Sequence, residues 1–155
     1  MSNIFITADL HLGHESAVTF RGFSSQTEHD ETIISNWNSR VGKNDSTFIL
    51  GDVVFGQKNL PLLSRLNGTK KLVMGNHDKY PIRSYLPYFT QIYGVVRYKG
   101  CILSHIPVHP GEFPRFTYNI HGHLHDKAIP DPRYICVSLE QTEYFPLLWA
   151  DLVLL

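Results

Sequence analysis

Histidine, aspartate and asparagine side chains gather in five short clusters along this chain, and each cluster directly follows a short apolar run. In chain order the clusters are Asp9-Leu10-His11, Gly51-Asp52, Gly75-Asn76-His77-Asp78, His105 and Gly122-His123-Leu124-His125. Imidazole and carboxylate groups together are ligands of Mn, Fe, Zn, Co or Ni, whereas Ca and Mg prefer shells of oxygen alone. The chain has nine histidines in 155 residues, and a transition-metal site would explain why five of them lie in these clusters.

The number of candidate ligands indicates two metal ions rather than one. A closed zinc site uses four protein ligands and a mononuclear catalytic site uses three. Here seven side chains are candidates: Asp9, His11, Asp52, Asn76, His105, His123 and His125. We therefore expect two divalent transition-metal ions, with Mn as the first choice, and Asp52 as the carboxylate between them. Two such ions would outweigh the charge of Asp9 and Asp52, so the site would attract an anion, and phosphate is the commonest partner of paired metals.

The spacing within the first and last clusters also predicts local geometry. In an extended chain, side chains two residues apart point to the same side. We therefore expect Asp9 with His11, and His123 with His125, to present both ligands together. His121 lies two residues before His123, so a His121/His123 ligand pair is an alternative register.

The elements that must position these residues follow from hydrophobic periodicity. We expect strands over 3–8, 47–50, 71–74, 93–98, 101–104, 118–122, 134–139 and 147–153, with a hairpin through Lys99-Gly100. Helices are predicted from Thr27, with Asp30 as its capping-box partner, to Gly42, over 59–66 with Asn59 as a possible cap, and briefly within 79–90. Trp37 belongs to the core face of the first helix. The alternation of strands and helices predicts an α/β fold, in which ligands bind beyond the carboxyl ends of strands. The five clusters can thus meet at one sheet edge.

The clusters, in this order, resemble the motifs of the calcineurin-like metallophosphoesterase superfamily: Asp-x-His, Gly-Asp, Gly-Asn-His-Asp/Glu, a lone His, and Gly-His-x-His. They span residues 9–125. The segments 8–14, 21–23 and 36–38 are similar to those of small stand-alone members from bacteria and phages. The resemblance implies two mixed β-sheets packed as a sandwich and flanked by helices.

The resemblance also implies a role for each residue. Asp9, His11 and His125 would hold one metal, Asn76, His105 and His123 the other, and Asp52 would lie between them. A metal-bridging hydroxide would attack phosphorus, His77 would stabilise the phosphoryl oxygens or protonate the leaving group, and Asp78 would orient the His77 loop. The implied function is hydrolysis of a phosphomonoester or phosphodiester. A nuclease of the same fold, or a non-catalytic interaction module, is the alternative.

One departure from the superfamily bears on the substrate. Its protein Ser/Thr phosphatases extend Gly-Asp to Gly-Asp-x-x-Asp-Arg-Gly, but Phe55 stands where the second Asp would be, and the Arg is missing. This disfavours a protein phosphatase. Loops 12–26, 53–58, 79–90 and 106–117 would set specificity. Candidate substrate contacts are His14, Arg21, His109 and Arg115, whereas we expect His29 to be a solvated helix residue.

Composition sets the remaining expectations. The 14 basic and 14 acidic residues balance, which excludes a domain that binds nucleic acid by a broad basic face alone. The charge therefore does not indicate nucleic acid, although it leaves it possible. The residues of the specificity loops suit a small phosphoester or nucleotide substrate, and no protein partner is implied. No signal peptide or membrane-spanning run is apparent. Cys101 and Cys136 are expected to be buried reduced thiols. We therefore expect one cytoplasmic domain over residues 1–155.

Overall fold

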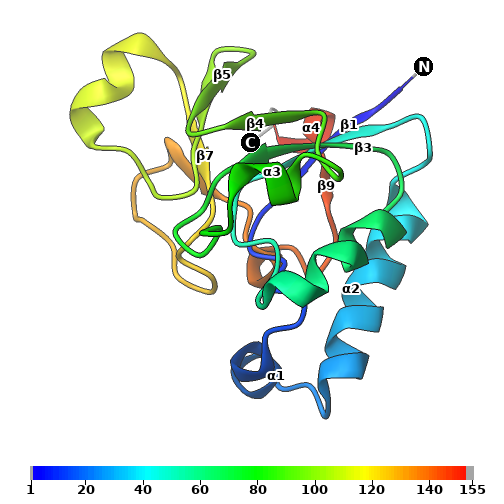
Figure 1. Ribbon diagram of the computed structural model, residues 1–155. Coiled ribbons are helices and arrows are strands. Elements are labelled where there is room, and N and C mark those ends of the chain that lie inside the picture. Colours follow the sequence, from blue (N-terminus) through cyan, green and yellow to red (C-terminus); the bar gives the residue numbers. More distant parts are fainter. Residues whose placement is uncertain (1, 153–155) are drawn as a thin grey trace.

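Two mixed β-sheets form the centre of the protein, whose computed structural model describes residues 2–152 (Figure 1). The first sheet has the strand order β4 (Gln91–Tyr93), β3 (Thr69–Val73), β2 (Ser46–Ile49), β1 (Ile4–Thr7) and β9 (Leu147–Leu148); β1 to β4 are parallel and β9 is antiparallel to β1. The second sheet has the order β5 (Val96–Tyr98), β6 (Cys101–Leu103), β7 (Asn119–His121) and β8 (Tyr134–Cys136); only β5 is antiparallel to its neighbour. The predicted α/β class is confirmed.

The two faces of the first sheet belong to two different hydrophobic clusters. Side chains alternate along a strand, so Ile6 and Phe48 face the second sheet and pack with Leu103 and Ile120. Their neighbours Phe5 and Ile49 face the other way, into the cluster beneath the helices. The molecule therefore consists of two packed sheets with helices on the outer face of the first.

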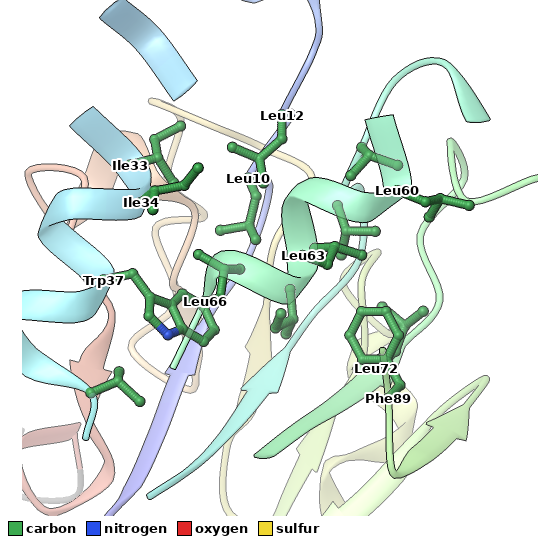
Figure 2. Close-up of a cluster of buried hydrophobic side chains, with 14 of the residues drawn as sticks. Leu10, Leu12, Ile33, Ile34, Trp37, Leu60, Leu63, Leu66, Leu72 and Phe89 are labelled. Carbon is green, nitrogen blue, oxygen red and sulfur yellow. The ribbon is translucent and has the colours of Figure 1, made fainter. Parts of the chain in front are cut away.

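That outer layer is formed by α2 (Gln26–Arg40) and the 3-10 helix η1 (Gln57–Arg65). Figure 2 shows Leu10 and Leu12, from the segment after β1, between Ile33 on α2 and Leu60 on η1. Trp37 is 1% exposed in this cluster, which confirms its prediction as a core residue. Because Leu10 and Leu12 are buried on either side of His11, the packing of the helices fixes the position of this candidate ligand.

The remaining helical segments are short and lie around the sheets. They are α1 (Glu15–Arg21), α3 (Ile82–Tyr85), η2 (Pro110–Arg115), η3 (Leu139–Gln141) and α4 (Trp149–Leu152). The η2 segment lies on the side of the molecule away from α2 (Figure 1). Among the described residues, no helix is both long and apolar enough to cross a membrane. Cys101 is buried, Cys136 is half-buried, and both are free thiols.

Several predicted boundaries are wrong. The expected strand 93–98 divides at Gly94 and Val95, because its first part pairs with β3 and its last part with β6 in the other sheet. The expected strand over 147–153 ends after two residues and continues as α4; residue 153 lies outside the described residues. The segment 12–26, predicted as a loop, contains α1.

The predicted helix caps are displaced as well. Helix α2 is capped by Ser25, whose side chain accepts from the N–H of Glu28, and the Glu28 carboxylate accepts from the N–H of Ser24. This arrangement resembles a capping box, with the return bond made to the residue before the N-cap. It begins two residues before Thr27 and leaves Asp30 free for a different contact. Gly56, rather than Asn59, precedes η1. The turn at Lys99-Gly100 is as predicted, with both residues at positive φ.

Candidate metal centre

The five clusters converge because their strands are parallel and end at the same edge. Asp9, Asp52 and Asn76 follow β1, β2 and β3 of the first sheet, while His105 and His123 follow β6 and β7 of the second. A parallel bridge between Ala8 and Ser138 joins the two sheets at this edge. The carboxyl ends of five strands therefore enclose one site, as expected for ligand sites in α/β sheets.

Asp52 lies between two histidines from different sheets. Its Oδ2 is 3.7 Å from Nε2 of His11 and 3.4 Å from Nε2 of His105. Two groups of potential ligand atoms, each lying within 4.8 Å of one another, can be drawn here: Asp9, His11 and His125, and Asp9, Asp52 and His105. The first is the trio implied by the superfamily motifs. Asp9 belongs to both groups, and Asp52 lies between His11 and His105.

The two remaining candidates, Asn76 and His123, form a compact group with His105. The Oδ1 of Asn76 is 2.8 Å from Nε2 of His105 and 3.0 Å from Nδ1 of His123. These two ring nitrogens are 3.3 Å apart. Three donor atoms from three loops thus point toward one place. Together with Asp52 they offer the mixed nitrogen and oxygen set that suits a transition metal.

Two buried atoms of the seven candidate ligands have no hydrogen-bond partner among the described residues. They are Oδ1 of Asp9 and Nε2 of His11, 3.7 Å apart. The partner oxygen, Oδ2 of Asp9, is occupied, because it accepts from the hydroxyl of Ser138 and the N–H of His123. A buried polar group without a partner costs about 1–3 kcal/mol. A divalent cation between these two atoms would satisfy both, so the residues present fit a metal ion.

The backbone at the ligands is left-handed rather than extended. Asp9, His11, Asp52, His123 and His125 all have φ between 51° and 70°. The expectation that the two ligand pairs lie on extended chain is therefore wrong. Non-glycine residues in this region cost about 1–3 kcal/mol each and persist where neighbouring structure holds them. Here the N–H groups of Asp9 and His11 are fixed by the carbonyls of Gly51 and Asp52.

A carboxylate that the sequence interpretation missed contacts His125, the last candidate ligand in the chain. The Oε1 of Glu140 lies 2.9 Å from Nδ1 of His125 and 2.8 Å from Nε of Arg21. A ligand histidine typically donates its second ring N–H to a carboxylate, which fixes the ring. The only sequence signal for Glu140 is one acidic residue after a predicted strand, too common to single out.

Arg21 is not placed as a substrate contact. Its side chain is fully buried, and its guanidinium donates to the carbonyls of Asp9 and Leu10 and to Nε2 of His29. His29, expected to be solvated, is likewise buried and pairs with Asp30, which accepts from the N–H of Gly13. Both expectations failed because α1 and α2 pack against the loop that carries the first two ligands.

The ionisation of the histidines differs across the site. Burial lowers the pKa values of His11 and His123, so both rings are neutral and able to bind a metal at neutral pH. Burial also opposes protonation of His105, but the adjacent Asp52 carboxylate outweighs it and raises the pKa. For His125 the hydrogen bond to Glu140 raises the pKa. Glu140 is partly buried, yet His125 and Arg21 hold its pKa at about 2.

His77 sits beside the ligands in an aromatic setting. Its ring centroid is 4.9 Å from Phe55 and 6.3 Å from His11. The Phe55 ring also stacks on the ring of His14, with the two ring centroids 3.5 Å apart. Burial, followed by the neighbouring His11 and His77, lowers the pKa of His14 to about 4. Nδ1 of His14 is 2.9 Å from Nδ1 of His11, so His14 is placed to support this ligand.

Asp78 binds two loops together rather than His77 alone. Its carboxylate accepts from the backbone N–H groups of Asp52, Val53 and Gly75. The N–H of His77 is instead bound by Oδ1 of Asp52. Burial raises the pKa of Asp78, and the three N–H donors oppose that shift. The Asp78 carboxylate thus sets the relative position of the β2 and β3 loops.

The remaining candidates lie farther out. His109 caps η2 by accepting from the N–H of Gly111, and Arg115 is exposed and pairs with Glu112. His121 is buried beside Tyr134, with Nδ1 on the carbonyl of Gly122. His121 lies in neither group of potential ligand atoms, although its buried Nε2 has no hydrogen-bond partner among the described residues.

Comparisons with known proteins give relatives along the whole chain. No family model matches. The Gene 66 protein of Mycobacterium phage D29 is 31% identical over 192 aligned positions, covering 99% of this chain and 92% of the relative. The uncharacterized protein MJ1445 of Methanocaldococcus jannaschii is 30% identical over 162, covering 95% of this chain and 87% of the relative.

A solved structure matches the fold. The protein of unknown function AQ665 from Aquifex aeolicus superposes with a TM-score of 0.78 at 27% identity, covering 99% of this chain and 98% of the other. None of the three descriptions states an activity. By identity and coverage, this chain belongs to the family of the Gene 66 protein of phage D29 and the archaeal MJ1445.

Proposed function

We propose that this protein is a phosphoesterase that depends on two divalent transition-metal ions, with the fold of the metallo-dependent phosphatases. The observation that carries the proposal is the position of Asp52, whose carboxylate lies within 3.7 Å of His11 and 3.4 Å of His105. One carboxylate between two imidazoles is the arrangement needed to bridge two ions. The unpaired Asp9 Oδ1 and His11 Nε2 support it.

The residues divide into holding and reacting groups. Asp9, His11 and His125 would hold one ion, Asn76, His105 and His123 the other, with Asp52 shared. When bound, such ions supply a water of lowered pKa and positive charge against the phosphoryl oxygens. His77 is half-buried beside this set, so its imidazole is placed to donate a proton to the leaving oxygen or to hold a phosphoryl oxygen.

Loading with Mn²⁺ tests the proposal. The panel contains p-nitrophenyl phosphate, bis-p-nitrophenyl phosphate, cyclic nucleotides and single-stranded DNA. Wild type with two bound ions is expected to hydrolyse at least one small phosphoester. Asp52→Ala should lose metal and activity together, whereas His77→Ala should keep the metal and lose about 10²–10⁴-fold in turnover. Metal-loaded wild type without activity on any member contradicts the proposal, and hydrolysis of DNA alone favours a nuclease.

A further inference from the structure

A pocket of about 550 Å³ adjoins the candidate metal centre on the side of His123 and His125. Its other lining residues are Phe20, Leu124, Asp126, Lys127 and Glu140. Its volume is within the range of about 300–1,000 Å³ that is usual for small-molecule sites. Two of the lining residues, His123 and His125, are candidate metal ligands. The organic group of an ester whose phosphoryl group lies at the metals can therefore extend directly into this pocket.

Phe20 is the distinctive wall of the pocket. Its side chain lies in the last turn of α1 and is 56% exposed. Its ring centroid is 5.6 Å from that of His125 and 6.4 Å from that of His11, with both imidazoles nearly perpendicular to it. Single exposed apolar residues are common on protein surfaces. This one differs because it stands edge-to-face with two candidate ligands, at the mouth of the site.

The lining combines an apolar wall with a polar rim. Phe20 offers an aromatic ring and Leu124 adds apolar contact, whereas Asp126 and Lys127 are exposed and carry charges of opposite sign. An aromatic ring can stack on the first pair, and ring N–H or carbonyl groups can meet the second. A flexible aliphatic group or an extended polar one would use only part of this surface.

We propose that this pocket binds the organic group of the phosphoester and selects a flat aromatic ring, either an aryl group or a nucleobase. The inference rests on the proposed phosphoesterase function, because the phosphoryl group must lie at the metals. Phe20 is then a specificity residue that contacts the substrate ring. It holds no metal and moves no proton.

Binding of two non-hydrolysable probes tests the pocket separately from turnover. Phenylphosphonate and methylphosphonate share the phosphonate group and differ in the ring. Calorimetric titration of the Mn²⁺-loaded protein should show tighter binding of the phenyl compound. Phe20→Ala should reduce that preference about three- to tenfold, which is the range expected for one aromatic contact. Phe20→Trp should restore it, with the Mn²⁺ content unchanged in both variants.

Ile106→Ala is the matched control. Ile106 is 52% exposed and lines a different pocket, of about 340 Å³, beside Asn76 and His105. Its variant should keep the full phenyl preference. Equal binding of the two probes by wild type, no binding of either, or a preference that moves with Ile106 instead of Phe20 overturns the proposal.

The two proposals fail in different ways. If the protein binds phenylphosphonate through Phe20 but hydrolyses no phosphoester, the result supports the binding pocket and contradicts the proposed function. If the protein hydrolyses phosphoesters but binds both probes equally, the result supports the proposed function and contradicts the role of the pocket.

Discussion

One carboxylate oxygen, Oε1 of Glu140, lies 2.9 Å from Nδ1 of His125 and 2.8 Å from Nε of Arg21. The same Arg21 guanidinium donates to the backbone carbonyl of Asp9 at 2.6 Å. Two candidate ligands from opposite ends of the chain are therefore held by a single buried network. Neither Arg21 nor Glu140 belongs to a group of potential ligand atoms, so we expect the network to act through the candidate ligands.

Glu140→Gln should weaken metal binding without unfolding the protein. The amide oxygen can still accept from His125, but the negative charge that orients the ring and neutralises Arg21 is lost. Substitutions of such outer carboxylates typically cost about 10–100-fold in metal affinity. Calorimetric titration with Mn²⁺ measures this, with Glu143→Gln, an exposed position nearby, as the control. An unchanged Mn²⁺ affinity in Glu140→Gln contradicts the role given to this residue.

Phe55→Leu should lower turnover while leaving two ions bound. The Phe55 ring lies between His14 and His77, at centroid distances of 3.5 and 4.9 Å. Aromatic contact with this ring therefore helps to place His77 beside the candidate ligands. Loss of one such contact is worth about 0.5–1.5 kcal/mol, a change of roughly three- to tenfold in kcat for a small ester. Phe55→Tyr is the conservative control, and an unaltered kcat in the leucine variant opposes this role.

The sequence predicted which residues meet but not how the backbone presents them. Strand ends and residue types suffice to place Asp52 between two imidazoles, because parallel strands align their carboxyl ends. The left-handed φ of Asp9 and His123 has no such signal, since aspartate and histidine are compatible with several conformations. Period-two alternation ends with each strand and does not hold in the loops that carry these residues.

The residues that support the candidate ligands from outside could not be predicted either, because their roles depend on contacts between distant segments. Arg21, His29 and Glu140 carry their roles through contacts between segments far apart in the chain, such as α1 with η3. Single polar residues on short helices are more often solvated. Their burial depends on how α1 and α2 pack against the loop that follows β1, and local periodicity does not report this packing.

Asp78→Asn should destabilise the fold even in the absence of metal. The carboxylate accepts from three backbone N–H groups, those of Asp52, Val53 and Gly75. An asparagine whose amide oxygen takes the place of Oδ2 keeps the N–H groups of Asp52 and Gly75 and turns its own N–H₂ toward the N–H of Val53. Leaving that one buried donor unpaired costs about 1–3 kcal/mol. Urea denaturation in EDTA measures the loss, with the exposed Asp151→Asn as control. A variant as stable as wild type would contradict the proposed bond pattern.

Metal binding should displace protons chiefly from two of the four candidate histidine ligands. Contacts with Asp52 and Glu140 raise the pKa values of His105 and His125, while burial lowers those of His11 and His123. Near the ordinary histidine pKa of about 6.5, the metal-free chain therefore carries protons on the first pair. A metal must remove those protons to bind. Mn²⁺ affinity should accordingly fall as the pH is lowered through these raised pKa values.

Glu140→Gln separates the contribution of His125 to this proton release. Without the carboxylate, the pKa of His125 should drop toward its ordinary value or below, because burial then acts against protonation. Fewer protons remain to be displaced near pH 6.5, so the variant should release up to about one proton less per chain than wild type. Titration of Mn²⁺ in buffers of different ionisation enthalpy measures the number released. Equal release by both proteins would show that Glu140 does not control the protonation of His125. A larger release by the variant would show that Glu140 lowers the pKa of His125 instead of raising it.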